Sequence, residues 1–108
     1  MKLKTIASGS KGNCYLLETD TGSLLIEAGI PINKLKKALE FDFSNIQGCL
    51  VTHEHQDHAK AIKDIAKLGI DVYASEGTLQ ALNCIGHRFI PITSKKSKII
   101  GDFEVLPF

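Results

Sequence analysis

The sequence predicts one α/β layered domain, and three observations support this. Short apolar segments alternate with amphipathic helical segments along the 108 residues, as in folds where helices cover a sheet. Hydrophobic residues make up 44% and charged residues 23%, which are globular values and exclude a disordered chain. No apolar run approaches the ~20 residues that span a bilayer, and the opening residues lack a secretory signal. We therefore expect no membrane partner.

The first half of the chain predicts three strands followed by a helix. The expected strands are residues 3–7, 14–19 and 23–27. Residues 20–22 form a tight connection, so the second and third strands make a hairpin. Leu24, Leu25 and Ile26 are continuous rather than alternating, which favours a strand covered on both faces. Apolar residues then recur at helical spacing from Ile32 to Leu39, with Pro31 in the first turn.

The second half predicts two more helices between short strands. A helix begins at Ala59 and closes at Gly69 as its C-terminal cap. Ser75 is the N-cap of a helix that runs to Gly86. The expected strands are residues 48–52, 71–74 and 89–92, with a hairpin over residues 98–106.

Charge and cysteine content indicate which partners and which cellular compartment to expect. Thirteen basic and twelve acidic residues give a net charge of +1, so no overall field attracts a polyanion. Three cysteines without C-x-x-C spacing argue against a disulfide framework or a zinc knuckle, and they predict a cytoplasmic protein. Their apolar contexts favour structural burial for Cys14, Cys49 and Cys84.

Two further segments each have two interpretations. The loop of residues 9–13 either cradles a phosphate through its backbone N–H groups or is a plain turn. The basic run of Lys95, Lys96 and Lys98 either contacts a phosphate backbone or is a solvated loop. Neither choice follows from the residues alone.

Three of the four histidines fall within six residues, in His53-Glu54-His55-Gln56-Asp57-His58. Imidazole and carboxylate groups are ligands of divalent metals such as zinc. The segment follows a buried strand and precedes a helix, which places it at the carboxyl end of a strand, where α/β sheets bind ligands. His53 and His55 point the same way in an extended chain. Asp57 and His58 fall at the turn into the helix, so the segment offers two pairs of ligands to two adjacent ions.

These residues resemble a known family. Thr52-His53-Glu54-His55-Gln56-Asp57-His58 matches the H-x-H-x-D-H motif of the metallo-β-lactamase superfamily. The opening Ala7-Ser8-Gly9-Ser10-Lys11-Gly12-Asn13-Cys14 and the strand end Leu25-Ile26-Glu27-Ala28-Gly29 also resemble that family. The opening is most similar to the bacterial single-domain branch of phosphodiesterases and DNA exonucleases.

The resemblance implies a metal centre. His53 and His55 would bind a first Zn²⁺, and Asp57 and His58 a second, with Asp57 also assigned to the catalytic centre. Mn²⁺ is an alternative metal, and a hydroxide bridging the two ions would be the nucleophile. Glu27 stands where the family usually has aspartate. Together with Thr52 it is expected to support the ligands from behind.

The resemblance also implies a fold: the N-terminal half of a metallo-β-lactamase-like αββα sandwich, with residues 1–108 as a partial domain. The family's remaining ligands would lie in a second half. The expected activity of the full-length protein is hydrolysis of a phosphodiester or nucleic acid, and residues 1–108 alone are expected to be inactive. The alternatives are a truncated, inactive metal-binding fragment that self-associates as a homo-oligomer, and a thioester or β-lactam hydrolase.

Overall fold

A computed structural model describes residues 1–53 and 55–107, apart from the side chains of Gln56 and Asp57. The strands are β1 (Lys2–Ala7), β2 (Cys14–Glu18), β3 (Ser23–Ala28), β4 (Ile46–Leu50), β5 (Val72–Ser75), β6 (Phe89–Ile92), β7 (Lys98–Ile100) and β8 (Phe103–Val105). The helices are α1 (Ile32–Ala38), α2 (Gln56–Ala59), α3 (Ile62–Lys67) and α4 (Glu76–Ala81). Within the described residues, no helix is long and apolar enough to cross a membrane.

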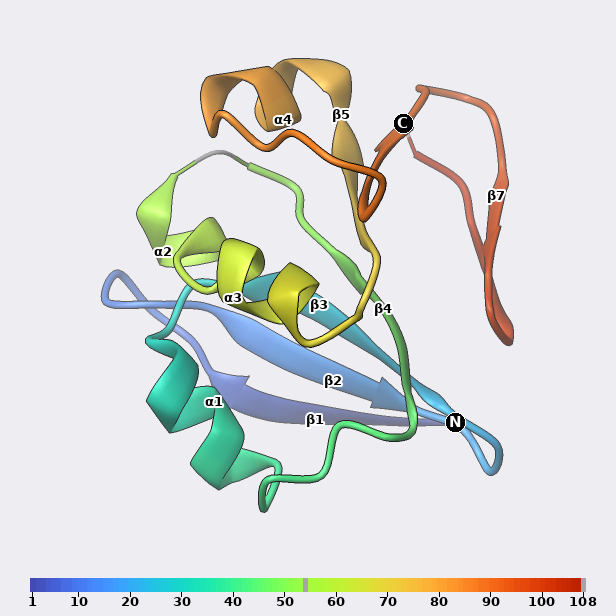
Figure 1. The fold of residues 1–108 in the computed structure, drawn as a ribbon. Helices are drawn as coiled ribbons and strands as arrows, with labels where there is room; N and C mark the ends of the chain where they lie inside the picture. Colours follow the sequence, from blue (N-terminus) through green and yellow to red (C-terminus); the bar gives the residue numbers. More distant parts are fainter. Residues whose placement is uncertain (54, 108) are drawn as a thin grey trace.

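Strands β1 to β6 form one sheet in their chain order, and β7 and β8 form a separate hairpin. Neighbours among β1, β2 and β3 are antiparallel, which confirms the predicted hairpin, and β3 to β6 are parallel. Parallel strands need crossover connections, and the segments containing the helices supply them (Figure 1). The carboxyl ends of β3, β4, β5 and β6 therefore share one edge of the sheet, the edge where α/β folds bind ligands.

Each face of the sheet has its own apolar core. One contains Leu25, Leu35 and Ile65, which bring together β3, α1 and α3. The other contains Leu24 and Phe103, so the β7–β8 hairpin packs on the opposite face. Leu24 and Leu25 are adjacent in β3, and both are almost fully buried. The prediction of a strand covered on both faces is confirmed.

The prediction of one helix from Ala59 to Gly69 is wrong, because the structure has two short helices in this region. Helix α2 starts earlier and ends at Ala59, and α3 begins at Ile62. The break has a tertiary cause: the N–H of Ala61 donates to the carbonyl of Ala28, at the end of β3, over 2.8 Å. This bond docks the chain onto the sheet. Gly69, with φ of 89°, follows α3 in the left-handed conformation of a C-terminal cap, as predicted.

The last predicted helix is shorter than expected. Ser75 is its N-cap, and its side chain accepts from the N–H of Thr78, as predicted. The helix ends at Ala81 instead of Gly86 because Asn83 adopts the left-handed conformation, with φ of 53°. Its N–H donates to Gln80, and the next N–H, of Cys84, donates to Leu79. This pair of bonds is a Schellman cap, for which Asn is a known alternative to Gly.

Strand β4 is shifted by two residues from the predicted 48–52. Its pairing with β3 runs from Ile46 to Leu50. Thr52 leaves the ladder because its N–H donates to the side chain of Glu27 and not to a strand carbonyl. The strand therefore ends where the candidate site begins.

Candidate metal centre

Glu27 is directed towards the His53–His58 segment by a β-bulge. Ile26 pairs with Tyr15 and Ala28 with Cys14, so Glu27 is the extra residue on β3. Its φ is 66°, a left-handed conformation that non-glycine residues rarely adopt. Bulges of this kind are frequent next to active sites, where they re-aim a side chain. Only 4% of Glu27 is exposed.

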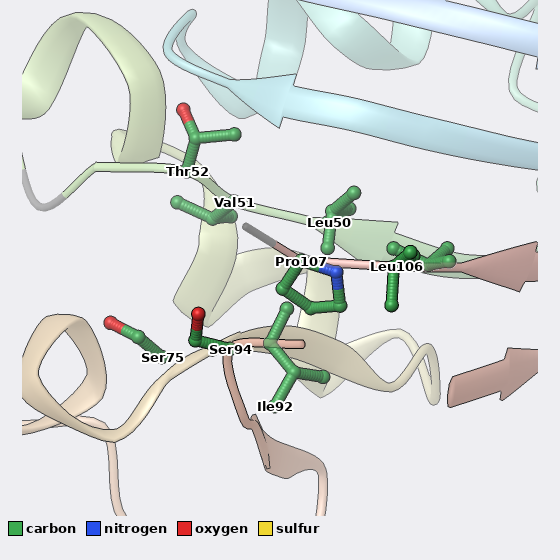
Figure 2. A pocket seen from close by; sticks show the side chains of 9 residues that line it. Leu50, Val51, Thr52, Ser75, Ile92, Ser94, Leu106 and Pro107 are labelled. Atoms are coloured by element: carbon green, nitrogen blue, oxygen red, sulfur yellow. The ribbon is translucent and has the colours of Figure 1, made fainter. Parts of the chain in front are cut away.

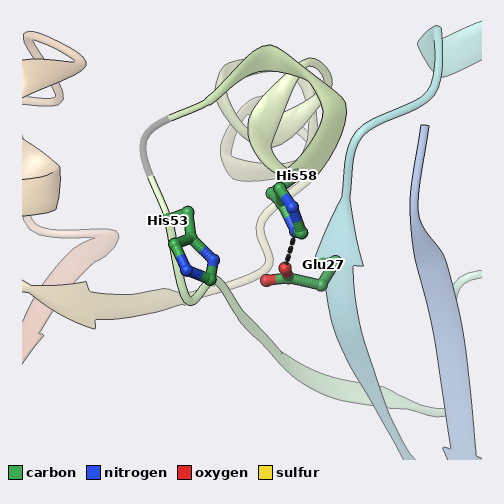
Figure 3. A group of neighbouring side chains, drawn as sticks. All are labelled: Glu27, His53 and His58. Carbon is green, nitrogen blue, oxygen red and sulfur yellow. Dashed lines mark hydrogen bonds and ion pairs between the residues drawn. The ribbon is translucent and has the colours of Figure 1, made fainter. Parts of the chain in front are cut away.

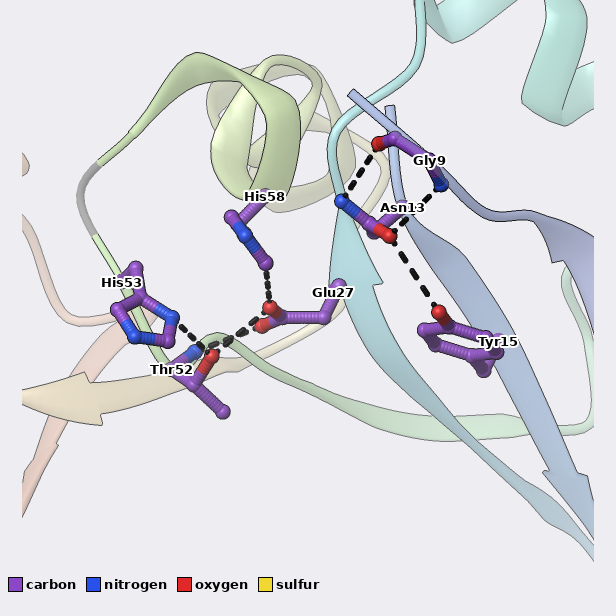
Figure 4. A network of polar contacts seen from close by, with 7 residues as sticks. All are labelled: Gly9, Asn13, Tyr15, Glu27, Thr52, His53 and His58. Carbon is purple, nitrogen blue, oxygen red and sulfur yellow. Dashed lines mark hydrogen bonds and ion pairs between the residues drawn. The ribbon is translucent and has the colours of Figure 1, made fainter. Parts of the chain in front are cut away.

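The buried carboxylate of Glu27 accepts three hydrogen bonds (Figure 4). Its Oε1 accepts the N–H of Thr52 at 2.7 Å, and its Oε2 accepts the hydroxyl of Thr52 at 2.8 Å. Oε2 also contacts Nδ1 of His58. A buried carboxylate is tolerated only when its lone pairs are used in this way. Glu27 thus links the end of β3 to Thr52, just before the histidine segment, and to His58, at its end.

This network assigns the tautomers of two histidines. The carboxylate only accepts, so Nδ1 of His58 carries the proton that it shares with Glu27. The hydroxyl of Thr52 donates its one proton to Glu27. In its 2.7 Å contact with His53, the hydroxyl oxygen therefore accepts a hydrogen bond from Nδ1–H. In the neutral form of each ring, Nε2 then carries the lone pair. This is how a carboxylate behind a histidine prepares it to bind a metal.

The structure brings the predicted histidines together. Ligand atoms of Glu27, His53 and His58 all lie within 4.8 Å of one another (Figure 3). The ring centroids of His53 and His58 are 4.8 Å apart, and those of His53 and His55 are 6.1 Å apart. His55 is exposed. The backbone of Asp57 lies in α2, and its side chain is outside the described part of the chain.

The donor set of this cluster fits a divalent metal such as zinc. Imidazole nitrogens are borderline ligands, and three of them in one segment suit zinc and related ions better than calcium or magnesium. Each carboxylate oxygen of Glu27 already accepts a hydrogen bond from Thr52. Glu27 therefore contacts Thr52 and His58 through its carboxylate, and it belongs, with His53 and His58, to the group of side chains that could hold an ion.

The sequence did not mark Asn13 and Tyr15 as parts of this region. The N–H of Gly29, at the end of β3, donates to the carbonyl of Asn13, which places Asn13 beside Glu27 (Figure 4). The side chain of Asn13 accepts the N–H of Gly9 and donates to the carbonyl of Gly9. Tyr15 donates its hydroxyl to the same side chain at 3.4 Å. Glycines followed by asparagine were the available signal. The N–H groups of Gly9 and Gly12 already donate within the loop, which favours the plain-turn interpretation over a phosphate cradle.

Two of the cysteines are fully buried and belong to the helix-side core, as predicted. Burial, and to a lesser degree the charge of Glu27, raises the pKa of the Cys14 thiol to about 12. Burial also raises the pKa of Cys49. Cys84 is only partly buried, and burial raises its pKa as well. Protonated thiols are poor nucleophiles and poor metal ligands, so the chemistry of this region belongs to the histidines.

One protein family matches both the fold of this chain and its histidine motif. The family described as the metallo-beta-lactamase superfamily matches residues 7–81, from the glycine-rich loop through α4. The chain belongs to the metallo-beta-lactamase superfamily. The match includes the end of β3 and the whole histidine segment, so the superfamily resemblance seen in the sequence is confirmed.

Among curated members of the superfamily, the chain is similar to two bacterial exodeoxyribonucleases. It is 37% identical over 119 residues to exodeoxyribonuclease YycJ of Bacillus anthracis, covering 100% of this chain and 44% of that protein. It is 39% identical over 118 residues to exodeoxyribonuclease WalJ of Streptococcus pneumoniae serotype 2 (strain D39 / NCTC 7466), covering 99% and 44% respectively. The chain thus spans less than half the length of these relatives.

Two solved structures share the fold of this chain. The B3 metallo-beta-lactamase BLEG-1 superposes with a TM-score of 0.75 at 23% identity, over 95% of this chain and 58% of that one. The chemotaxis sensor ODP, solved as a peroxy diiron species, gives a TM-score of 0.77 at 16% identity, over 97% and 48%. The predicted metallo-β-lactamase-like α/β fold is confirmed.

Proposed function

We propose that the protein is a metal-dependent phosphodiesterase that cleaves DNA, acting in the cytoplasm. One structural observation carries this proposal: ligand atoms of His53, His58 and Glu27 converge within 4.8 Å at the carboxyl ends of β3 and β4. The two exodeoxyribonucleases support the substrate class, because the chain matches both along nearly its whole length.

In this proposal four side chains hold two Zn²⁺ ions, with Mn²⁺ as the alternative. His53 and His55 are the ligands of one ion, and Asp57 and His58 are the ligands of the other. The imidazole rings of His53, His55 and His58 form one cluster, which suits adjacent ions. Ions of this kind, when bound, polarise a phosphoryl oxygen and lower the pKa of water towards neutrality.

The chain's own residues orient this centre. Glu27 keeps a proton on Nδ1 of His58, and through Thr52 it keeps one on Nδ1 of His53. With Nδ1 of each ring occupied by these contacts, Nε2 is the nitrogen that each ring would present to a metal. The left-handed backbone at Glu27 holds the carboxylate in place without exposing it.

Substitution of two histidines tests the proposal. The variant His53→Ala with His55→Ala should lose the tighter-bound metal and all metal-dependent turnover of bis-p-nitrophenyl phosphate and single-stranded DNA. His87→Ala is the matched control, since His87 is exposed and lies outside the cluster. Plasma mass spectrometry of the purified protein gives the metal stoichiometry. Unchanged stoichiometry or turnover in the double variant would overturn the assignment.

A further inference from the structure

A pocket adjoins the candidate metal centre and has no role in the proposed function so far. It has a volume of about 390 Å³, within the range of small-molecule sites. Its lining residues come from the carboxyl ends of β4, β5 and β6 and from the segment that ends β8 (Figure 2). They are Leu50, Val51, Thr52, Ser75, Ile92, Ser94, Val105, Leu106 and Pro107.

One residue connects this pocket to the candidate centre. Thr52 lines the pocket, and its hydroxyl also donates to Glu27 and lies 2.7 Å from Nδ1 of His53. A substrate group bound in the pocket would therefore lie next to the residues proposed to bind metal. The pocket and the histidine cluster occupy neighbouring parts of the same sheet edge.

The walls of the pocket are apolar and its rim is polar. Ile92, Val105 and Leu106 give it carbon surfaces, and Leu106 remains 54% exposed. Ser94 lines the pocket and is exposed. The next residue, Lys95, donates its N–H to the carbonyl of Pro107 at 2.7 Å. This bond joins two walls of the pocket and fixes the position of the lysine-bearing loop beside it.

We propose that this pocket binds the nucleobase of the nucleotide whose phosphate lies at the candidate metal centre. This inference rests on the proposed phosphodiesterase function and names the part of the substrate that the enzyme grips. A nucleobase is planar, with apolar faces and a polar edge, and it matches carbon walls with the hydroxyl of Ser94 at the rim. An acyl chain would fill the walls but would leave the hydroxyl of Ser94, at the rim, without a partner on the ligand.

The lysine loop strengthens the assignment to a nucleotide. Lys95 and Lys96 follow Ser94 directly and are exposed. The chain as a whole carries a net charge of only +1, so a polyanion must be held by local charge. A base in the pocket would bring the neighbouring phosphates of a strand towards this loop.

Binding of two matched probes tests the proposal without relying on catalysis. Thymidine 5′-monophosphate and deoxyribose 5-phosphate differ only by the base, and each is titrated into isotope-labelled, metal-free protein and followed by NMR. The base should raise the affinity by about tenfold. It should also shift the amide signals of Leu50, Ile92 and Leu106, which deoxyribose 5-phosphate should leave in place.

Two serine variants test whether the preference for thymidine 5′-monophosphate arises in the pocket. Ser94→Trp fills the pocket from its rim and should abolish the preference for thymidine 5′-monophosphate. Ser97→Trp makes the same change at an exposed serine of the same loop that does not line the pocket, and the preference should remain. Equal affinity for the two probes, or a preference that survives Ser94→Trp, would overturn the pocket assignment. Absence of metal-dependent turnover in the unmodified protein would instead count against the proposed function alone.

Discussion

The two ends of the main sheet are each tied together by one carboxylate, and the two carboxylates lie in opposite environments. At the carboxyl end of β3, Glu27 is 4% exposed and accepts from Thr52 and His58. At the other end, Asp102, in the turn between β7 and β8, is exposed and accepts from the hydroxyls of Thr19 and Thr21. The backbone N–H of Asp102 also donates to Gln47 at 2.9 Å.

The difference between the two networks is one of solvation. Without its partners, Glu27 would be a buried charge, which costs several kcal/mol. Asp102 would regain water on losing its partners, so its hydrogen bonds are worth little net free energy. The buried network also has a strained backbone at its centre, with φ of 66° at Glu27. Strain and burial together mark the end of the sheet that orients side chains, whereas the exposed end only attaches a hairpin.

Glu27→Gln should have the largest effect. The amide keeps the shape but replaces one acceptor oxygen with a donor that faces N–H and O–H donors. We expect a loss of about 3 kcal/mol in the free energy of unfolding and a fall of 10–100-fold in metal affinity. Denaturant unfolding and metal titration measure the two quantities.

Glu27→Asp is the matched control, since it keeps the charge and shortens the reach by one methylene. It should fall between Glu27→Gln and the unmodified protein in metal affinity. A Glu27→Gln variant with unaltered metal affinity would reduce Glu27 to an ordinary strand-end carboxylate and remove the contrast between the two ends.

The sequence predicted the fold and the histidine segment better than it predicted the network behind them. Strand and helix periodicity and the H-x-H-x-D-H spacing are local, so they can be read along the chain. The break before α3 depends on a bond from Ala61 to Ala28, and the early end of α4 depends on a left-handed Asn83. The contact of Thr21 with Asp102 joins residues 81 positions apart. Contacts of this kind have no local pattern.

Thr52→Val should have the next largest effect. It removes the hydroxyl that donates to Glu27 and contacts Nδ1 of His53, while keeping the branched shape. The N–H of Thr52 still donates to Glu27, so we expect little change in unfolding. Metal affinity should fall by about tenfold, because the tautomer of His53 is no longer fixed. Thr52→Ser retains the hydroxyl and should retain the affinity. A loss in both variants would point to packing instead of the hydroxyl contacts.

Asp102→Asn should have the smallest effect, in keeping with its exposed position. We expect the thermal midpoint to shift by less than about 4 °C near neutral pH, with metal affinity unchanged.

Hydrogen bonding from Thr21, and to a lesser degree from Gln47 and Thr19, lowers the pKa of the Asp102 carboxyl below its usual value of 3.8. A group whose pKa is lower in the folded state stabilises the protein above its unfolded pKa and loses that contribution as the pH falls through the folded pKa. The difference between Asp102→Asn and the unmodified protein should therefore be constant from about pH 5 to pH 8 and should shrink below pH 3.8. Thermal melts across this pH series measure it. A large and pH-independent loss, comparable with that of Glu27→Gln, would show that the two ends of the sheet do not differ in the way that their solvation implies.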